Sequence, residues 1–215
     1  MRYIFLRKAW DMLDGLFKSK IDGFWDILGR GLARTGLTPN GVTLMGFGLT
    51  LSACIIFLWS ENYIWFGLML GLTFACDSLD GAVARVTDQS TKFGSYLDAV
   101  IDRYQEILVY FVIVLKTGFW VPVFMVVTGS LLISYNKARC AIDIPISNND
   151  WPDLLERLER VILICFALIF QGFFPDQLIL FYMLVLLGIG THLTAIQRFF
   201  RAKKLLDNED QARLP

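Results

Sequence analysis

Histidine and paired cysteine, the residues that most often hold zinc or redox centres, are scarce in this chain. His192 is the only histidine, which argues against a histidine-based metal site or a catalytic triad. The four cysteines, Cys54, Cys76, Cys140 and Cys165, are scattered without the close spacing of metal or redox motifs. We therefore expect neither a zinc site nor a disulfide framework.

Extended polar regions are also few. Hydrophobic residues make up 55% of the chain and the mean hydropathy is +0.53, values that a soluble domain of this length rarely reaches. A membrane-spanning helix needs roughly 20 mainly apolar residues. The candidate segments are 41–60, 63–82, 94–116, 119–137, 158–174 and 177–197. We therefore expect an all-α integral membrane protein with six transmembrane helices.

The N-terminal segment lacks the clean apolar core and small-residue site of a cleavable signal peptide. Residues 1–37 instead predict an amphipathic helix that lies along the membrane interface. Its apolar side would carry Trp10, Leu13, Phe17, Phe24 and Leu28. An ordinary helix that packs on the bundle is an open alternative. We expect the catalytic domain to span 38–206 and a flexible tail to span 207–215.

The positive charges favour one side of the membrane. Six spans place both termini on the same side as the 83–93 and 138–157 loops, and this side holds every Lys and Arg except Lys116. Cytoplasmic loops carry an excess of Lys and Arg. The loops on the other side are short. We therefore expect both termini and the active site at the cytoplasmic face of a multi-pass cell-membrane protein.

Four acidic residues interrupt the apolar pattern at the ends of two adjacent predicted helices. Asp77 and Asp80 are three residues apart, and Asp98 and Asp102 are four apart, so each pair lies on one helix face. A short connection would bring all four together, where their charges repel one another unless a cation binds. Oxygen ligands favour Mg²⁺ or Mn²⁺. This number of carboxylates suits two ions, the arrangement used in phosphoryl transfer.

Two other classes of protein fit parts of the pattern. A cation carrier would use intramembrane acids, but it would place them near the midplane on broken helices. A purely structural membrane protein gains nothing from four clustered acids. The stretch GLMLG, residues 67–71, permits close helix contact. That contact would form either within the chain or between two copies.

The acidic stretch resembles the signature of the CDP-alcohol phosphotransferase family, D-x2-D-G-x2-A-R-x8-G-x3-D-x3-D. Every spacing is met by Asp77, Asp80, Gly81, Ala84, Arg85, Gly94, Asp98 and Asp102. The resemblance covers roughly residues 30–200. It implies a six-helix core, homodimers, and a reaction that joins a CDP-linked donor to an alcohol and releases CMP.

The resemblance also implies roles for the individual residues. Asp77, Asp80 and Asp98 would hold one ion, and Asp77, Asp98 and Asp102 would hold the other. Asp102 would be the catalytic base for the acceptor hydroxyl. The residues expected to contact the CDP-linked lipid are Gly81, Arg85 and Thr91, with Pro39, Asn40 and Thr43 from the turn TPNGVT.

Basic residues at the inner helix ends point to a phosphorylated acceptor. They are Lys137, Arg139, Arg157, Arg160 and Arg198. Their stretches, SYNKAR, ERLER and TAIQR, are similar to elements of the phosphatidylinositol phosphate synthase branch and its archaeal counterpart. In that branch Lys137, Arg160 and Arg198 would bind the phosphate of inositol phosphate.

Two departures from that branch leave the acceptor open. Ala141 stands where a glutamate is common, and Leu158 stands where a proline is common. Glycerol 3-phosphate as acceptor, or CDP-inositol as donor with inositol phosphate, are the alternatives. Glu106, one turn beyond Asp102, would pair with Arg103 or with another buried polar group. Nothing in the pattern suggests a nucleic-acid partner.

Overall fold

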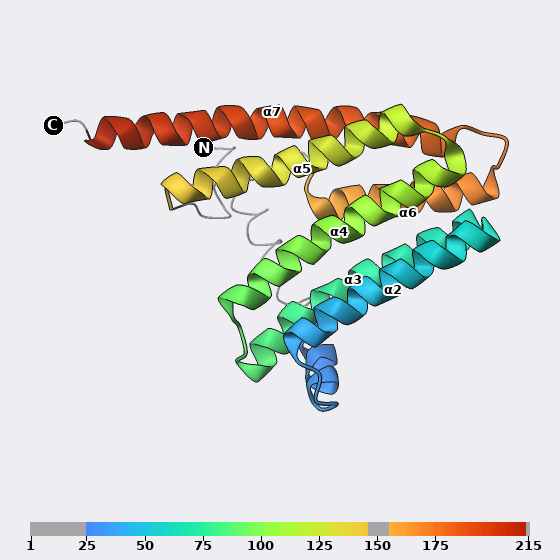
Figure 1. The fold of residues 1–215 in the computed structure, drawn as a ribbon, viewed down its shortest axis with the longest axis horizontal. Coiled ribbons are helices and arrows are strands. Elements are labelled where there is room, and N and C mark those ends of the chain that lie inside the picture. The colour runs from blue at the N-terminus through green and yellow to red at the C-terminus, as the bar shows by residue number, and fades with distance from the viewer. Residues whose placement is uncertain (1–24, 146–154, 214–215) are drawn as a thin grey trace, which may run out of the picture. The chain divides into compact units, whose positions relative to one another are not determined.

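The structure is a computed structural model, and it describes residues 25–145 and 155–213. The described parts contain helices and no strands (Figure 1). The long helices are α2 (Pro39–Ser60), α3 (Tyr63–Thr87), α4 (Lys92–Thr117), α5 (Trp120–Asp143), α6 (Arg157–Phe173) and α7 (Ile179–Arg213). Residues 25–33 form a further short helix. The all-helical prediction is therefore confirmed for these residues.

Each predicted span corresponds to one of the long helices, but the six do not qualify equally as spans. Four of them, α2, α3, α5 and α7, are long and apolar enough to cross a membrane. Helix α4 carries Asp98, Asp102, Arg103 and Glu106, and α6 has only 17 residues. The chain is a multi-pass membrane protein. It has six spans only if α4 and α6 also cross the membrane.

The short helix 25–33 packs against other parts of the chain. Trp25 and Leu32 contact a buried cluster that is formed by Val42, Leu79 and Val83. A Cβ atom at Gly29 would lie 3.0 Å from the backbone of Ala82 on α3, so the two helices approach closely there. Residues 25–33 thus match the packed alternative. The rest of the predicted interfacial helix, including Trp10, Leu13, Phe17 and Phe24, lies outside the described residues.

The chain forms two compact units. The first contains the described residues up to Leu49 together with Leu72–Asp102, and the second contains Thr50–Gly71 and the described residues from Arg103 onward. Helices α2, α3 and α4 each pass from one unit into the other. The residues predicted to bind the metal and the CDP-lipid fall in the first unit, and those predicted to bind the acceptor fall in the second.

Helices α5 and α7 lie side by side in the second unit (Figure 1). Their close approach depends on glycine, because a Cβ atom at Gly129 would collide with the Thr191 side chain. Cys140 and Ile144 pack against Ala202, Leu205 and Leu206 of α7. Helix α7 then continues to Arg213, through most of the residues that the sequence predicts as a flexible tail.

The two glycines of GLMLG have different surroundings. A Cβ atom at Gly67 would lie 2.9 Å from the carbonyl oxygen of Cys165 and 2.8 Å from the side chain of Ile169, both on α6. A Cβ atom at Gly71 would meet nothing within 4 Å among the described residues. Gly67 therefore serves packing within the chain.

This difference predicts opposite results for two alanine variants. Gly67→Ala should lower the free energy of unfolding by about 1–3 kcal/mol, because a backbone carbonyl cannot move away without shifting α6. Gly71→Ala should be neutral or slightly stabilising, since alanine is favoured over glycine in a helix by about 1 kcal/mol. Thermal unfolding of both variants in detergent micelles tests the prediction. Equal midpoints would contradict it.

Candidate active site

The end of α3 and the start of α4 carry the signature residues in the first unit. Helix α3 ends at Thr87, and Asp88 adopts a left-handed conformation with φ 54°, which aspartate tolerates better than most residues. The hydroxyl of Thr91 accepts a hydrogen bond from the backbone N–H of Gly94 at 2.9 Å and so caps the start of α4.

Gly94 is closely packed at this helix start. A Cβ atom there would lie 3.0 Å from Asn40 Oδ1 and 3.0 Å from Thr91 Oγ1. Both distances are tighter than most side-chain contacts, so another residue here would require the Asn40 and Thr91 side chains to shift by a few tenths of an ångström. The glycine therefore lets α2 and α4 meet beside the acidic residues.

Three of the four predicted metal ligands come together. Asp77, Asp98 and Asp102 each offer a carboxylate oxygen, and the three oxygens lie within 4.8 Å of one another. Asp77 is 9% exposed and Asp102 is 8% exposed. Three carboxylates at this separation repel one another strongly in a poorly solvated place, and a hard divalent cation relieves the repulsion. The donor set therefore fits Mg²⁺ or Mn²⁺ and does not fit zinc.

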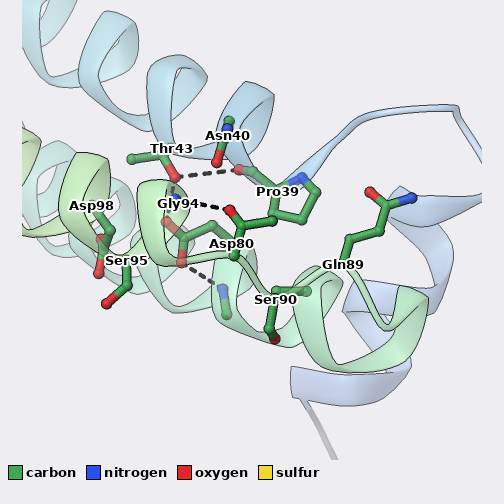
Figure 2. Close-up of a pocket in the computed structure, with 12 residues that line it drawn as sticks. Pro39, Asn40, Thr43, Asp80, Gln89, Ser90, Gly94, Ser95 and Asp98 are labelled. Carbon is green, nitrogen blue, oxygen red and sulfur yellow. Dashed lines mark hydrogen bonds between the residues drawn. The ribbon is translucent and has the colours of Figure 1, made fainter.

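Asp80 faces a different group of atoms. Its carboxylate accepts hydrogen bonds from the Thr43 hydroxyl and from the backbone N–H of Gly81 (Figure 2). The Thr43 hydroxyl is also 3.2 Å from the carbonyl oxygen of Pro39. Asp80 is thus held toward the start of α2, and it is not in the group of three. Its predicted role as a ligand of one ion stays a prediction.

A cavity of about 220 Å³ opens beside these residues, within the first unit (Figure 2). Five residues predicted to contact the CDP-linked lipid line it: Pro39, Asn40, Thr43, Gly81 and Thr91. Asp98 belongs both to this lining and to the carboxylate group. The cavity therefore gives a ligand direct access to the acidic site.

Arg85, the sixth predicted lipid contact, does not line this cavity. Its Nε and Nη2 atoms donate to Asp26 Oδ1 at 3.3 and 3.0 Å. Its Nη1 atom lies 3.6 Å from the place that a Cβ of Gly81 would occupy. Asp26 therefore turns the guanidinium along the side of α3, next to a cavity-lining glycine.

A second cavity, of about 360 Å³, lies in the second unit and is strongly basic. Four predicted acceptor-binding residues line it: Lys137, Arg157, Arg160 and Arg198. Arg139 lies outside it and forms an exposed ion pair with Asp143 at 2.6 Å. The reason is helical geometry, since two residues along an α-helix rotate a side chain by about 200°. Lys137 and Arg139 thus face different ways.

Several arginines of this cavity are held by buried partners. Arg160 forms a bidentate ion pair with Glu106, with N–O distances of 2.8 and 3.1 Å. Arg157 Nη2 donates to Gln105 Oε1 at 2.9 Å. Arg198 Nη1 donates to the carbonyl oxygen of Ile133 at 2.6 Å. Of the two partners predicted for Glu106, Arg103 or another buried polar group, the structure shows the second, which is Arg160. Arg103 donates to the hydroxyl of Ser134.

Comparison with known proteins decides the family. Residues 36–196 match the protein family described as CDP-alcohol phosphatidyltransferase. The chain belongs to this family. The match contains the carboxylate group and all but one of the residues predicted to bind substrate, Arg198 being the exception. The chain is therefore an enzyme of the CDP-alcohol phosphatidyltransferase class.

Two curated relatives narrow the comparison. Archaetidylinositol phosphate synthase of Pyrococcus horikoshii is 36% identical over 181 residues, which cover 84% of this chain and 91% of that protein. Phosphatidylinositol phosphate synthase of Mycobacteroides abscessus is 31% identical over 196 residues, which cover 85% and 88%. Both relatives thus span most of the chain.

Solved structures of one further relative share the fold. Phosphatidylinositol phosphate synthase of Mycobacterium tuberculosis with CDP-DAG bound is similar at a TM-score of 0.73 and 25% identity, over 83% of this chain and 92% of that one. The same protein in complex with manganese and citrate gives a TM-score of 0.74 at 25% identity, over 83% and 88%. Within the family, a divalent metal is thus present in at least one member.

Some residues of the two cavities carry no sequence signal. Gln89, Ser90 and Ser95 line the first cavity (Figure 2), and Arg103 and Ser134 line the second. Arg103 lies outside the signature, although it directly follows Asp102, the last residue of that pattern. Asp26 lies 59 positions from its partner Arg85, and no local pattern could have linked the two.

Proposed function

We propose that this family member transfers a phosphatidyl-type group from a CDP-linked lipid to the hydroxyl of inositol phosphate, with release of CMP. The observation that carries the proposal is the carboxylate group Asp77, Asp98 and Asp102 beside a cavity lined by the predicted lipid contacts. The curated relatives are named for synthesis of an inositol phosphate lipid. The lipid chains of the donor, diacylglycerol or archaeol, are left open.

The first cavity would bind the CDP part of the donor. Pro39, Asn40 and Thr43 begin α2, and Gly81 leaves backbone uncovered on α3. A missing side chain lets a phosphate approach the backbone closely. Arg85 would grip the diphosphate after small side-chain rotation, since a guanidinium matches phosphate bidentately.

Two divalent ions, Mg²⁺ or Mn²⁺, would neutralise the charge that develops on the diphosphate when the bond to CMP breaks. Asp77, Asp98 and Asp102 would hold one, and Asp77, Asp80 and Asp98 the other. Asp102 would also accept the proton of the acceptor hydroxyl, which then attacks the phosphorus that is bonded to the lipid alcohol. A new bond between the acceptor oxygen and this phosphorus forms as the bond from the phosphorus to CMP breaks. The proton passes to Asp102 and CMP leaves, so atoms and charge balance.

The second cavity would bind the phosphate of the acceptor. Its lining contains five cationic side chains and one acidic side chain: Arg103, Lys137, Arg157, Arg160 and Arg198, with Glu156. A phosphate monoester can form charge-assisted hydrogen bonds with these cationic side chains, whereas a neutral alcohol cannot balance their charge. Glycerol 3-phosphate satisfies the same charge requirement and is the second candidate.

An acceptor panel separates these alternatives. Purified protein with a CDP-linked lipid and Mg²⁺ should release CMP with myo-inositol phosphate, and should do so far more slowly with glycerol 3-phosphate or free inositol. CDP-inositol in place of the lipid tests the alternative in which CDP-inositol is the donor and inositol phosphate the acceptor. Release of CMP with free inositol at the same rate would refute a phosphorylated acceptor.

The remaining topology is also a proposal. Six spans, with α4 and α6 included, would place both termini and the active site at the cytoplasmic face, in agreement with the position of the basic residues. The catalytic domain would run from 38 to 206, after the juxtamembrane segment 1–37. A homodimer is expected for the family.

A further inference from the structure

Arg160 is the most restrained cation of the second cavity. Its side chain is only 4% exposed, although it lines the cavity. Nε and Nη2 donate to the two carboxylate oxygens of Glu106, and Nη1 donates to the carbonyl oxygen of Leu155 at 3.0 Å. Three separate acceptors on two sides therefore fix the plane of the guanidinium.

This restraint leaves part of the guanidinium for a ligand. An arginine has five N–H hydrogens in one plane, and the described residues accept three of them. The remaining hydrogens belong to Nη1 and Nη2, the two nitrogens that bind phosphate side by side. Glu106 thus occupies one edge of the guanidinium and leaves hydrogens on the terminal nitrogens.

The neighbouring residue of α4 repeats the arrangement. Gln105 is fully buried, and its Oε1 accepts a hydrogen bond from Arg157. Arg157 and Arg160 both belong to the first turn of α6, and both line the cavity. Two consecutive side chains of α4 therefore hold the two arginines of the ERLER stretch.

We propose that Glu106 is a positioning residue of the acceptor site, which fixes the Arg160 guanidinium in the orientation that binds the acceptor phosphate. The substrate class rests on the proposed function, whereas the anion-binding geometry does not. Two other roles are distinguishable from this one. Glu106 could only join α4 to α6, or it could only reduce the positive charge of the cavity.

Titration of the purified full chain with inorganic phosphate, by isothermal titration calorimetry, tests the proposal. Glu106→Gln keeps the shape but places an amide N–H₂ against an arginine N–H, so the bidentate pair is lost. We expect phosphate to bind about tenfold more weakly, the effect of one lost charge-assisted hydrogen bond. Glu159→Gln is the matched control, because Glu159 precedes Arg160, is exposed and loses the same charge.

The outcomes separate the three roles. Equal phosphate affinity in Glu106→Gln and wild-type protein would leave Glu106 as a helix joint, and tighter binding would make it a regulator of cavity charge; either result overturns the proposal. Glu106→Gln should have no further effect in an Arg160→Lys background, because lysine cannot form the fork. An effect of the same size there would also overturn it.

A second variant covers the case in which Glu106→Gln does not fold. Glu106→Asp keeps the buried charge but shortens the side chain by one methylene, so it cannot reach both nitrogens. It too should weaken phosphate binding, and wild-type affinity would refute positioning. In turnover assays Glu106→Asp should raise the KM for inositol phosphate and leave the KM for the CDP-lipid unchanged. If wild-type protein uses no phosphorylated acceptor, the proposed function fails, and the phosphate titration still decides the role of Glu106.

Discussion

Asp102→Asn should reduce the rate of CMP release by about 10²- to 10⁴-fold, the range for removal of a general base. Asparagine has the same shape as aspartate but cannot accept the proton of the acceptor hydroxyl at neutral pH. It also removes one negative charge from the group of Asp77, Asp98 and Asp102. The affinity for Mn²⁺, measured by calorimetry, should therefore fall together with the rate.

Two further variants make this prediction specific. Asp98→Asn should lose both activity and Mn²⁺ affinity, because Asp98 belongs to the carboxylate group and also lines the first cavity. Asp176→Asn is the control, since Asp176 is exposed in the connection between α6 and α7. All three should unfold at temperatures close to that of the wild-type protein. Wild-type turnover in Asp98→Asn or Asp102→Asn would eliminate the carboxylate group as the catalytic centre.

The second large effect should appear in the acceptor site. Lys137→Ala should raise the KM for the phosphorylated acceptor by about 10- to 100-fold, as expected when a hydrogen bond to a charged group is lost. The KM for the CDP-lipid should not change, because Lys137 lines only the second of the two cavities. Steady-state kinetics with each substrate varied in turn measures both constants.

Arg139→Ala provides the comparison for Lys137→Ala. The two residues lie on the same helix and carry the same charge, but Arg139 points outside the cavity and pairs with Asp143. Exposed ion pairs contribute about 0–1 kcal/mol, so Arg139→Ala should behave as the wild-type protein. A similar rise of KM in both variants would mean that overall charge, and not the cavity, determines acceptor affinity.

The carboxylate group and the cavity beside it could be predicted because the required information is local. Asp98 and Asp102 are one turn apart on a single helix, and residues 88–91 connect α3 to α4 directly. Short connections between antiparallel helices leave few ways to arrange the ends. The signature spacing therefore predicts the convergence of Asp77, Asp98 and Asp102 almost without tertiary information.

Side-chain partners from distant segments could not be predicted in the same way. The sequence places Arg85 beside the predicted lipid contacts, but Asp26, 59 positions away, binds it. Asp80 is turned aside by Thr43, which begins a different helix. Such contacts depend on rotation angles and packing that a spacing pattern does not contain. The helices themselves could be predicted, because the length of an apolar segment is a local property of the sequence.

The connection between α3 and α4 explains the fixed interval of eight residues between Arg85 and Gly94. Residues 88–91 form this connection. Asp88 adopts the left-handed backbone conformation that ends α3, and Thr91 caps the start of α4. One residue inserted into or deleted from α4 between the capping Thr91 and Asp98 would rotate Asp98 and Asp102 by about 100° about the helix axis, relative to the start of α4. Asp98 and Asp102 would then face away from Asp77 with every acidic side chain still present. The helical interval between the capping Thr91 and the acids therefore decides whether Asp98 and Asp102 face Asp77.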